Sequence, residues 1–202
     1  MAVVIEDRGR NNRIELPVDV LAKCTGKITV LGDENEIVVG EGTFLRQVTI
    51  STDKGGGHFF AGANCLLAGI FRCNARGAAI SIGTGTTIQQ ARILCMEAGN
   101  IRIGDDCMFS EQIYMTNSDM HSVIDAATGK RINPPADITI EPHVWIGLGA
   151  TILKGTHIKR DAVVAAHSVV RGHVPGGTIV AGIPAKVIRT GVTWDRRLLP
   201  ID

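Results

Sequence analysis

The stretch "ITIEPHVWIGLGATILKGTHIKRDAVVAAHSVV", residues 138–170, decides the fold of this chain of 202 residues. A large apolar residue recurs at every sixth position, namely at Ile140, Ile146, Ile152, Ile158, Val164 and Val170. A second set with the same period is small or β-branched and consists of Val144, Ala150, Thr156, Ala162, Ser168 and Val174. An α-helix cannot keep a period of six on one face, and a meander of antiparallel strands does not need one. A coil with three short flat sides does need it, because each side turns one large and one small residue inward.

A wider repeat precedes this stretch. Two apolar residues separated by one residue recur as Ile14 and Leu16, Ile37 and Val39, Phe59 and Ala61, Ile80 and Ile82, and Ile101 and Ile103, at steps of 23, 22, 21 and 21 residues. Gly closes the last four units, and the third and fifth residues beyond it are small and apolar, as in Thr43 and Leu45, Cys65 and Leu67, Thr86 and Ile88, and Cys107 and Phe109. The repeat predicts roughly seven or eight stacked coils. The longer steps leave room for corner loops such as 52–57.

Composition agrees with an all-β protein. Aromatic residues make up 4% of the chain and Gly contributes 24 residues, which suits short strands separated by turns better than helices. We expect a single domain over residues 1–202, with a parallel β-helix over 12–189, a protruding loop at about 116–137 and a short tail at 190–202. The alternative is a sandwich of short strands, but a sandwich would not keep one register through six consecutive hexapeptides.

The formal net charge of +1 gives no electrostatic sign of a nucleic-acid or membrane partner. The charged "EDR" near the start is followed by no long apolar run, so we expect neither a signal peptide nor a membrane span, and we expect the protein to be cytoplasmic.

The repeat is interrupted once, between Met115 and Ile138, by the polar segment "TNSDMHSVIDAATGKRINPPAD". Compact domains seldom carry so long an insertion unless it is functional or disordered. His121 lies near its start, which makes it a candidate catalytic residue, whereas the other five histidines are interpreted as surface or satisfied residues. Asp119 could orient its imidazole, but a turn-stabilising role suits that aspartate better.

Three motifs support a resemblance over about residues 78–190: the opening stretch, "VVAAHSVV" at 163–170 and "VAGIPAKVIR" at 180–189. They resemble the left-handed β-helix O-acetyltransferases, the group that includes galactoside, maltose and polysaccharide O-acetyltransferases. The "NSDMHS" loop followed by "GKRINPP" is most similar to the polysaccharide branch, including polysialic acid O-acetyltransferases. The resemblance implies a left-handed coil and transfer of an acetyl group from acetyl-CoA to a sugar or polysaccharide hydroxyl.

The resemblance also implies roles for individual residues. The family's catalytic histidine precedes the tryptophan of "VWIG" by a fixed interval, which His121 matches by preceding Trp145 by 24 residues. His121 would act as general base for direct attack on the thioester, without an acyl-enzyme, which suits an imidazole at neutral pH. Trp145 would lie near the reacting groups, where its indole N–H or the adjacent backbone could stabilise an oxyanion. The alternative for Trp145 is packing at a corner of the coil.

Acetyl-CoA is implied as the acyl donor, and the residues implied to contact it are Leu148, Ala166, Arg171, Lys186 and Arg189. The first two would offer backbone groups to the pantetheine arm, and the cations would lie near the nucleotide phosphates. Two positions depart from the family pattern: Gly172 replaces the usual Lys, whose role Arg171 could take, and Glu141 replaces the usual Gly, which we interpret as a surface corner.

The family implies a homotrimer in which the loop of His121 meets the cofactor groove of a neighbouring chain. Trp194 is expected to pack the tail on the last coil or on such a neighbour. Cys65 and Cys107 occupy the small inward position of the repeat and are expected in the core. The five cysteines show no C-x-x-C pair, and we expect no metal.

Alternative functions remain open at this point. An N-acetyltransferase for an amino sugar or an antibiotic would use the same base. A γ-carbonic-anhydrase-like zinc enzyme would use the same fold with three histidines, and a trimeric assembly subunit would need no His121 at all.

Overall fold

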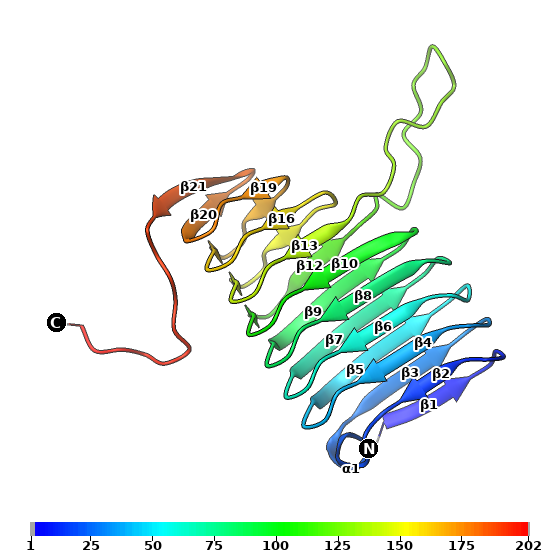
Figure 1. Cartoon of the computed structure of the whole chain (residues 1–202). Helices are drawn as coiled ribbons and strands as arrows, with labels where there is room; N and C mark the ends of the chain where they lie inside the picture. Colours follow the sequence, from blue (N-terminus) through cyan, green and yellow to red (C-terminus); the bar gives the residue numbers. More distant parts are fainter. Residues whose placement is uncertain (1–2, 202) are drawn as a thin grey trace.

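The computed structural model describes residues 3–201 and is a parallel β-solenoid built from two sheets (Figure 1). The smaller sheet contains β2 (Arg13–Glu15), β4 (Glu36–Val39), β6 (His58–Ala61), β8 (Ala78–Ile82), β10 (Gly99–Ile103), β13 (Ile138–Ile140), β16 (His157–Ile158) and β19 (His173–Val174). The larger sheet contains β1 (Val3–Asp7), β3 (Gly26–Val30), β5 (Phe44–Thr52), β7 (Leu66–Cys73), β9 (Thr87–Cys95), β11 (Met108–Phe109), β12 (Ile113–Thr116), β14 (Trp145–Ile146), β15 (Thr151–Ile152), β17 (Val163–Val164), β18 (Val169–Val170), β20 (Thr178–Gly182) and β21 (Ala185–Thr190).

Each of the eight strands of the smaller sheet begins one coil, so the predicted stack of coils is confirmed. We call this strand side 1. The larger sheet supplies sides 2 and 3, because β9 pairs with both β11 and β12 of the next coil. Corners 1, 2 and 3 follow the sides of the same number. In the coil that begins at β13 these corners are residues 141–144, 147–150 and 153–156.

The strand register places apolar residues at equivalent positions in successive coils. Side 1 aligns Ile37, Phe59, Ile80, Ile101 and Ile138 in successive coils. All five are at most 1% exposed. Burying one such side chain is worth about 1.5–3 kcal/mol relative to leaving it in water. The stacked column therefore explains why the sequence keeps one register, and the expected core positions Cys65 and Cys107 are buried as well.

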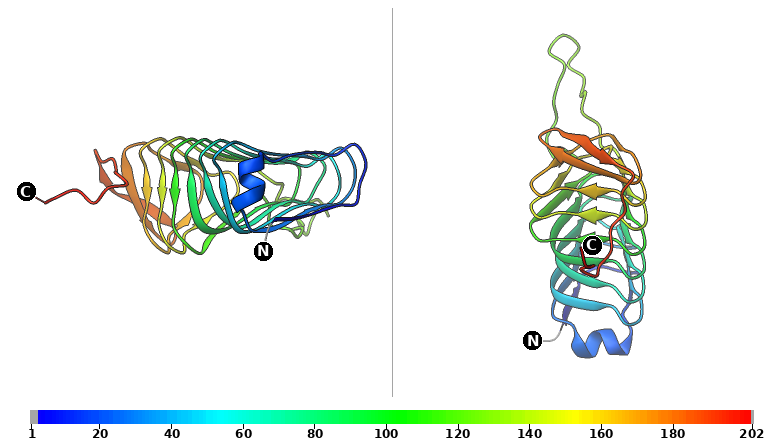
Figure 2. Two further views of the ribbon diagram at one scale, coloured as in Figure 1. Left: turned by 90° about the horizontal axis from the view of Figure 1, so that it is seen from below. Right: turned by 90° about the vertical axis from the view of Figure 1, so that its left-hand side faces the viewer.

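Three elements near the ends of the solenoid were not predicted. β1 pairs with β3, so the coils begin before residue 12. The helix α1 (Val18–Lys23) lies across the N-terminal end of the solenoid, where Val20 is fully buried and covers the open core (Figure 2). β21 folds back antiparallel on β20 instead of forming another coil. These elements add to the coils expected over 12–189, since an open core needs caps that the repeat itself does not encode.

The predicted excursion is confirmed between β12 and β13. Figure 1 shows it standing away from the coils as a narrow hairpin. Its base is still part of the core, because Asn117 and Ser118 are buried. Ile124 and Arg131 form an antiparallel bridge further out.

Candidate active site

His121 lies in the excursion at corner 3, with its side chain exposed. Its backbone N–H donates to the Asp119 carbonyl at 2.8 Å, and its carbonyl accepts from Asn133 Nδ2 at 2.8 Å. Neither ring nitrogen hydrogen-bonds to any of residues 3–201. The backbone is therefore fixed while the imidazole is available to an incoming hydroxyl group.

A partly exposed ion pair anchors the base of the excursion beneath His121. Arg131 donates two hydrogen bonds of 2.7 Å to the two carboxylate oxygens of Glu97, and Ser118 Oγ donates a third at 2.5 Å. The Arg131 guanidinium and the Ser118 hydroxyl lower the pKa of Glu97 to about 2. The carboxylate thus stays charged and ties the two ends of the loop to the preceding coil.

Asp119 has the loop-stabilising role that its turn position predicts. Its carboxylate accepts from Lys154 Nζ at 2.6 Å and from Asn133 Nδ2 at 2.7 Å, and the Lys154 ammonium is the main reason why the pKa of Asp119 is lowered. It makes no hydrogen bond to the His121 ring. In this chain the imidazole is therefore not oriented by Asp119.

A polar pocket of about 260 Å³ opens beside His121 at corner 3. It is lined by Lys54, Asn74, Met96, Glu97, Met120, His121, Ser122 and Arg131. Trp145 is not among these residues, because it begins side 2 of its coil, next to corner 1. The structure therefore does not bring the two predicted catalytic residues together within one chain.

Trp145 is 37% exposed, and its backbone N–H donates to the Ala162 carbonyl at 3.0 Å. That amide is consequently unable to serve a developing oxyanion. The indole N–H forms no hydrogen bond within residues 3–201. Of the two donors considered at this residue, the indole is the one that remains free.

The C-terminal tail packs beside Trp145, so Trp194 returns the tail to the solenoid, but on the coil that begins at β13 and not on the last coil as expected. The Trp194 ring stacks on His143 with ring centroids 4.3 Å apart, lies 6.4 Å from Trp145, and donates Nε1–H to the His143 carbonyl at 2.9 Å. His143 Nδ1 in turn lies 2.7 Å from Asp161 Oδ1. Sequence reasoning assigned no such partner to His143, because 51 residues separate it from Trp194.

Arg196 fastens the tail further along corner 1. Its guanidinium donates to Asp106 Oδ1 and Thr87 Oγ1 at 2.9 Å each, and to the carbonyls of Cys107 and Gly85 at 3.0 and 3.3 Å. It also lies 5.5 Å from the Trp194 ring centroid. The tail thereby covers corner 1 from Trp194 toward the N-terminal coils.

Leu148 and Ala166 lie in adjacent coils at corner 2, where His167 N–H donates to the Leu148 carbonyl at 2.7 Å. Their own amide N–H groups donate to no described residue, so both could bind the amides of a pantetheine arm. Lys186 lies in the same row, because it pairs with Ala181 at the end of β20. These three residues form the part of the predicted cofactor site that one chain assembles.

Arg189 and Arg171 stand apart from that row. Arg189 pairs with Ile179, which is aligned through Val163 with Trp145, so it lies toward corner 1. Arg171 follows β18 and lies at corner 3. Corner 3 also carries His121, so Arg171 shares a corner with the predicted base, whereas Lys54 and Arg131 are the cations that line the pocket beside it.

Glu141 has a structural role at corner 1, where it contacts His157 Nε2 at 2.8 Å and accepts from the Arg160 amide at 3.0 Å. Among residues 3–201, no group of three or more His, Cys, Asp or Glu side chains is arranged to hold a metal ion. No helix in the described part of the chain is long and apolar enough to cross a membrane.

The chain is 30% identical over 193 residues to a polysialic acid O-acetyltransferase of Neisseria meningitidis, an alignment that covers 95% of this chain and 89% of that protein. Its structure is similar to that of the polysialic acid O-acetyltransferase OatWY, with a TM-score of 0.88, 27% identity and coverage of 97% and 93% of the two chains. A hexapeptide-repeat acetyltransferase of Vibrio cholerae complexed with acetyl-coenzyme A matches with a TM-score of 0.51 and 25% identity, over 75% of this chain and 69% of that one. No family model matches the chain.

Proposed function

The chain belongs to the hexapeptide-repeat acetyltransferases and is an acetyl-CoA-dependent O-acetyltransferase, and we propose that it acetylates a hydroxyl group of a polysaccharide with His121 as general base. The choice of acceptor rests on the 30% sequence identity to a polysialic acid O-acetyltransferase, in an alignment that covers 95% of this chain. The choice of base is supported by the unengaged imidazole on the excursion.

In the proposed reaction an unprotonated ring nitrogen of His121 accepts the proton of the acceptor hydroxyl. The hydroxyl oxygen attacks the thioester carbonyl carbon of acetyl-CoA, and the carbonyl oxygen becomes an oxyanion. Collapse of this intermediate re-forms the carbonyl and expels the CoA thiolate, which takes the proton from the imidazolium. A positioned general base of this kind contributes about 10²- to 10⁴-fold to the rate.

The indole N–H of Trp145 is the proposed donor to the oxyanion. Leu148 and Ala166 would bind the pantetheine arm through their free amide groups, and Lys186, Arg189 and Arg171 would serve the phosphates as charge-assisted donors. Trp194 holds the tail against Trp145, so the tail would act on this site by fixing the position of the indole.

We propose that the site is completed by a second chain in a homotrimer. One chain places His121 at corner 3 and the Leu148–Ala166 row at corner 2, so the two parts face different directions. In a ring of identical subunits, corner 3 of one copy can face corner 2 of the next, as a head-to-tail interface requires. The protruding hairpin carries exposed Val123, Ile124 and Ile132, which suit burial against such a neighbour.

The proposal is tested by incubating the purified protein with acetyl-CoA and a panel of acceptors while free CoA thiol is measured. The panel contains polysialic acid, sialic acid monomer, maltose, galactoside, glucosamine and an aminoglycoside. We expect turnover with the polysaccharide and an alkali-labile ester in the product. Turnover confined to the amines would contradict O-acetylation, and turnover confined to the neutral sugars would contradict the proposed acceptor class.

A further inference from the structure

Corner 2 is one residue shorter in the third coil than in its neighbours. Along β5 and β7, Arg46 aligns with Ala68 and Val48 with Gly69, so Gln47 has no counterpart in β7. Along β7 and β9 the register shifts back, since Leu67 aligns with Ile88 and Gly69 with Ala91. The corner residues of the second and fourth coils therefore project beyond a recess at Gly69.

The recess is built into the backbone and stays free of side chains. Gly69 has a φ of +119°, and a Cβ on it would lie 2.0 Å from the carbonyl oxygen of Ala91. No residue with a side chain could occupy that position without moving β9. The sequence thus enforces an indentation between two projecting corners.

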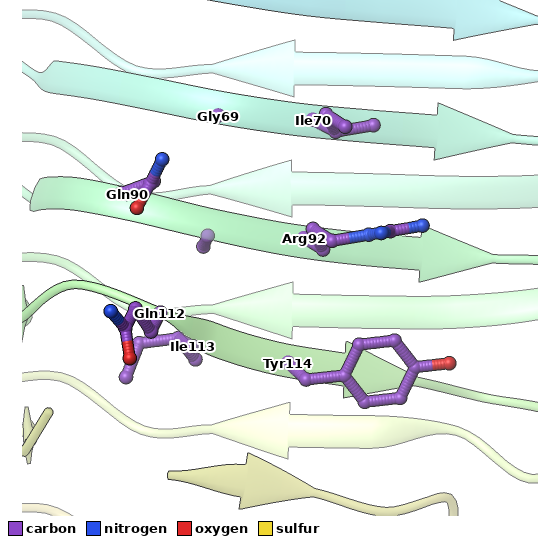
Figure 3. Close-up of a pocket in the computed structure, with 8 residues that line it drawn as sticks. Gly69, Ile70, Gln90, Arg92, Gln112, Ile113 and Tyr114 are labelled. Atoms are coloured by element: carbon purple, nitrogen blue, oxygen red, sulfur yellow. The ribbon is translucent and has the colours of Figure 1, made fainter. Parts of the chain in front are cut away.

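The indentation is a trough made of two pockets of about 450 and 330 Å³ that share Gly69 and Gln90. The pocket on side 3 is lined by Gly69, Ile70, Gln90, Ala91, Arg92, Gln112, Ile113 and Tyr114. The pocket at corner 2 is lined by Arg46, Gln47, Ala68, Gly69, Gln89, Gln90 and Glu111. Figure 3 shows Gln90 and Gln112 standing at one end of the first pocket, with Arg92 and Tyr114 extending along its strands.

The chemistry of the trough suits an acidic carbohydrate. The Arg92 guanidinium forms no ion pair or hydrogen bond within residues 3–201, so its fork of donors is available to a carboxylate. The side-chain amides of Gln90 and Gln112 and the hydroxyl of Tyr114 each donate and accept, as sugar hydroxyl groups require. Ile70 and the Tyr114 ring supply apolar surface for a pyranose ring, and Glu111 is the one acidic residue among the lining residues.

The trough is in line with the proposed cofactor row. Gly149 N–H donates to the Glu111 carbonyl, and His167 N–H donates to the Leu148 carbonyl, so corner 2 runs without interruption from Ala166 through Leu148 to Glu111. An acceptor lying in the trough would therefore approach the end of that row from the N-terminal coils, while acetyl-CoA occupies the C-terminal coils.

We propose that this trough is a subsite for the polymeric acceptor, where Arg92, Gln90, Gln112 and Tyr114 bind a carboxylate-bearing segment several sugars away from the hydroxyl that is acetylated. The proposal rests on the polysaccharide function proposed above. It predicts that the enzyme prefers a long acidic chain over its own monomer, because only a chain spans both the trough and the catalytic residues.

The test compares the wild-type protein with Arg92→Ala, Arg92→Lys and Tyr114→Phe, using polysialic acid, sialic acid monomer and dextran as acceptors. Arg102→Ala is the control, because Arg102 is an exposed cation on the other sheet, paired with Asp137. For Arg92→Ala we expect the KM for polysialic acid to rise about tenfold, with the KM for acetyl-CoA and the kcat unchanged. Arg92→Lys should restore part of this loss, and the control should behave as the wild type.

Binding of polysialic acid without acetyl-CoA, measured by calorimetry, separates this inference from the proposed function. Weaker binding by Arg92→Ala supports the trough even if turnover is lost for another reason. The inference is contradicted if wild-type turnover on polysialic acid is intact and Arg92→Ala changes neither its KM nor its binding. It is also contradicted if the variant raises only the KM for acetyl-CoA, or lowers the molecular mass in solution, because the trough would then belong to the cofactor or to a subunit interface.

Discussion

At the scale of residues, the proposed chemistry depends on two groups with free hydrogen-bonding capacity. Within residues 3–201 the His121 ring forms no hydrogen bond while its backbone is fixed, and the Trp145 indole N–H forms none while the Trp145 backbone N–H donates to the Ala162 carbonyl. A base and an oxyanion donor both need this combination of a fixed position and an open atom. The two residues can act together only if another copy of the chain supplies one of them.

Replacing Trp145 by Phe tests the oxyanion role. The change keeps an aromatic ring beside Trp194 and removes the indole N–H. We expect kcat to fall about a hundredfold, the effect of losing one oxyanion donor, while the KM for acetyl-CoA stays the same. Steady-state kinetics measure both. An unchanged kcat would instead assign Trp145 the packing role.

The sequence predicts the position of His121 on the excursion but not the packing around the coils. An interruption of a strict repeat is visible in one dimension, and so is its 24-residue distance to Trp145. The sequence does not reveal that Trp194 stacks on His143 or that Arg196 runs along corner 1. Both contacts depend on how a tail without a repeat folds back. Likewise, the recess at Gly69 arises from a register difference between coils that only the pairing of strands reveals.

At the scale of elements, the tail behaves as a strap across corner 1. Arg196 bonds to groups in two coils, whereas Arg197 beside it pairs, among the residues that the structure describes, only with Asp195. We expect Arg196→Ala to lower the free energy of unfolding by about 1–2 kcal/mol, since a charged donor is removed from several acceptors. Arg197→Ala should change it by less than about 0.5 kcal/mol.

Thermal unfolding followed by circular dichroism measures the difference, which corresponds to a few degrees for a chain of this size. Equal melting temperatures for the two variants would show that the strap contributes nothing to stability. A fall in activity that accompanies Arg196→Ala would connect the strap to Trp145.

The excursion should loosen in acid. The pKa of Glu97 is lowered from 4.5 to about 2, so its ion pair with Arg131 is fully present above about pH 4.5 and is lost as the pH falls toward 2. The protection of the amides of residues 118–133 against exchange, measured by NMR at pH 5 and pH 3 and corrected for the intrinsic exchange rate at each pH, should therefore be lower at pH 3. In Glu97→Gln the loop should be loose at both values. A loop equally protected at both pH values in the wild type would contradict this anchor.

Elements inside the repeat could be predicted and elements at its ends could not. The hexapeptide period specifies a coil because every coil meets the same neighbours. The helix α1 and the antiparallel strand β21 close the ends of the solenoid, where one neighbouring coil is missing. Neither segment carries the repeat pattern. In α1 it is Val20 that is buried against the core.

At the scale of the whole molecule, the proposed mechanism requires active sites that are shared between chains. His121→Ala and the double variant Lys186→Glu/Arg189→Glu should each be inactive alone, the second through repulsion of the acetyl-CoA phosphates. Trimers assembled from an equal mixture should recover up to about a quarter of wild-type activity. Each site receives an intact His121 with a probability of one half and, independently, an intact Lys186 and Arg189 with a probability of one half.

Activity of the mixture is compared with that of each variant assembled alone, at equal protein concentration. Mixed assemblies that remain inactive would show that both contributions come from the same chain. The mass of the wild-type assembly by light scattering, expected at three times 21.5 kDa, provides the necessary reference.

The turnover of His121→Ala with acetyl-CoA and polysialic acid tests directly whether His121 is the general base. We expect kcat to fall by about 10²- to 10⁴-fold, with acetyl-CoA binding and assembly mass unchanged, because only the general base is removed. His58→Ala, which changes an exposed histidine of the smaller sheet paired with Glu36, should retain wild-type turnover. Wild-type turnover by His121→Ala would contradict the mechanism.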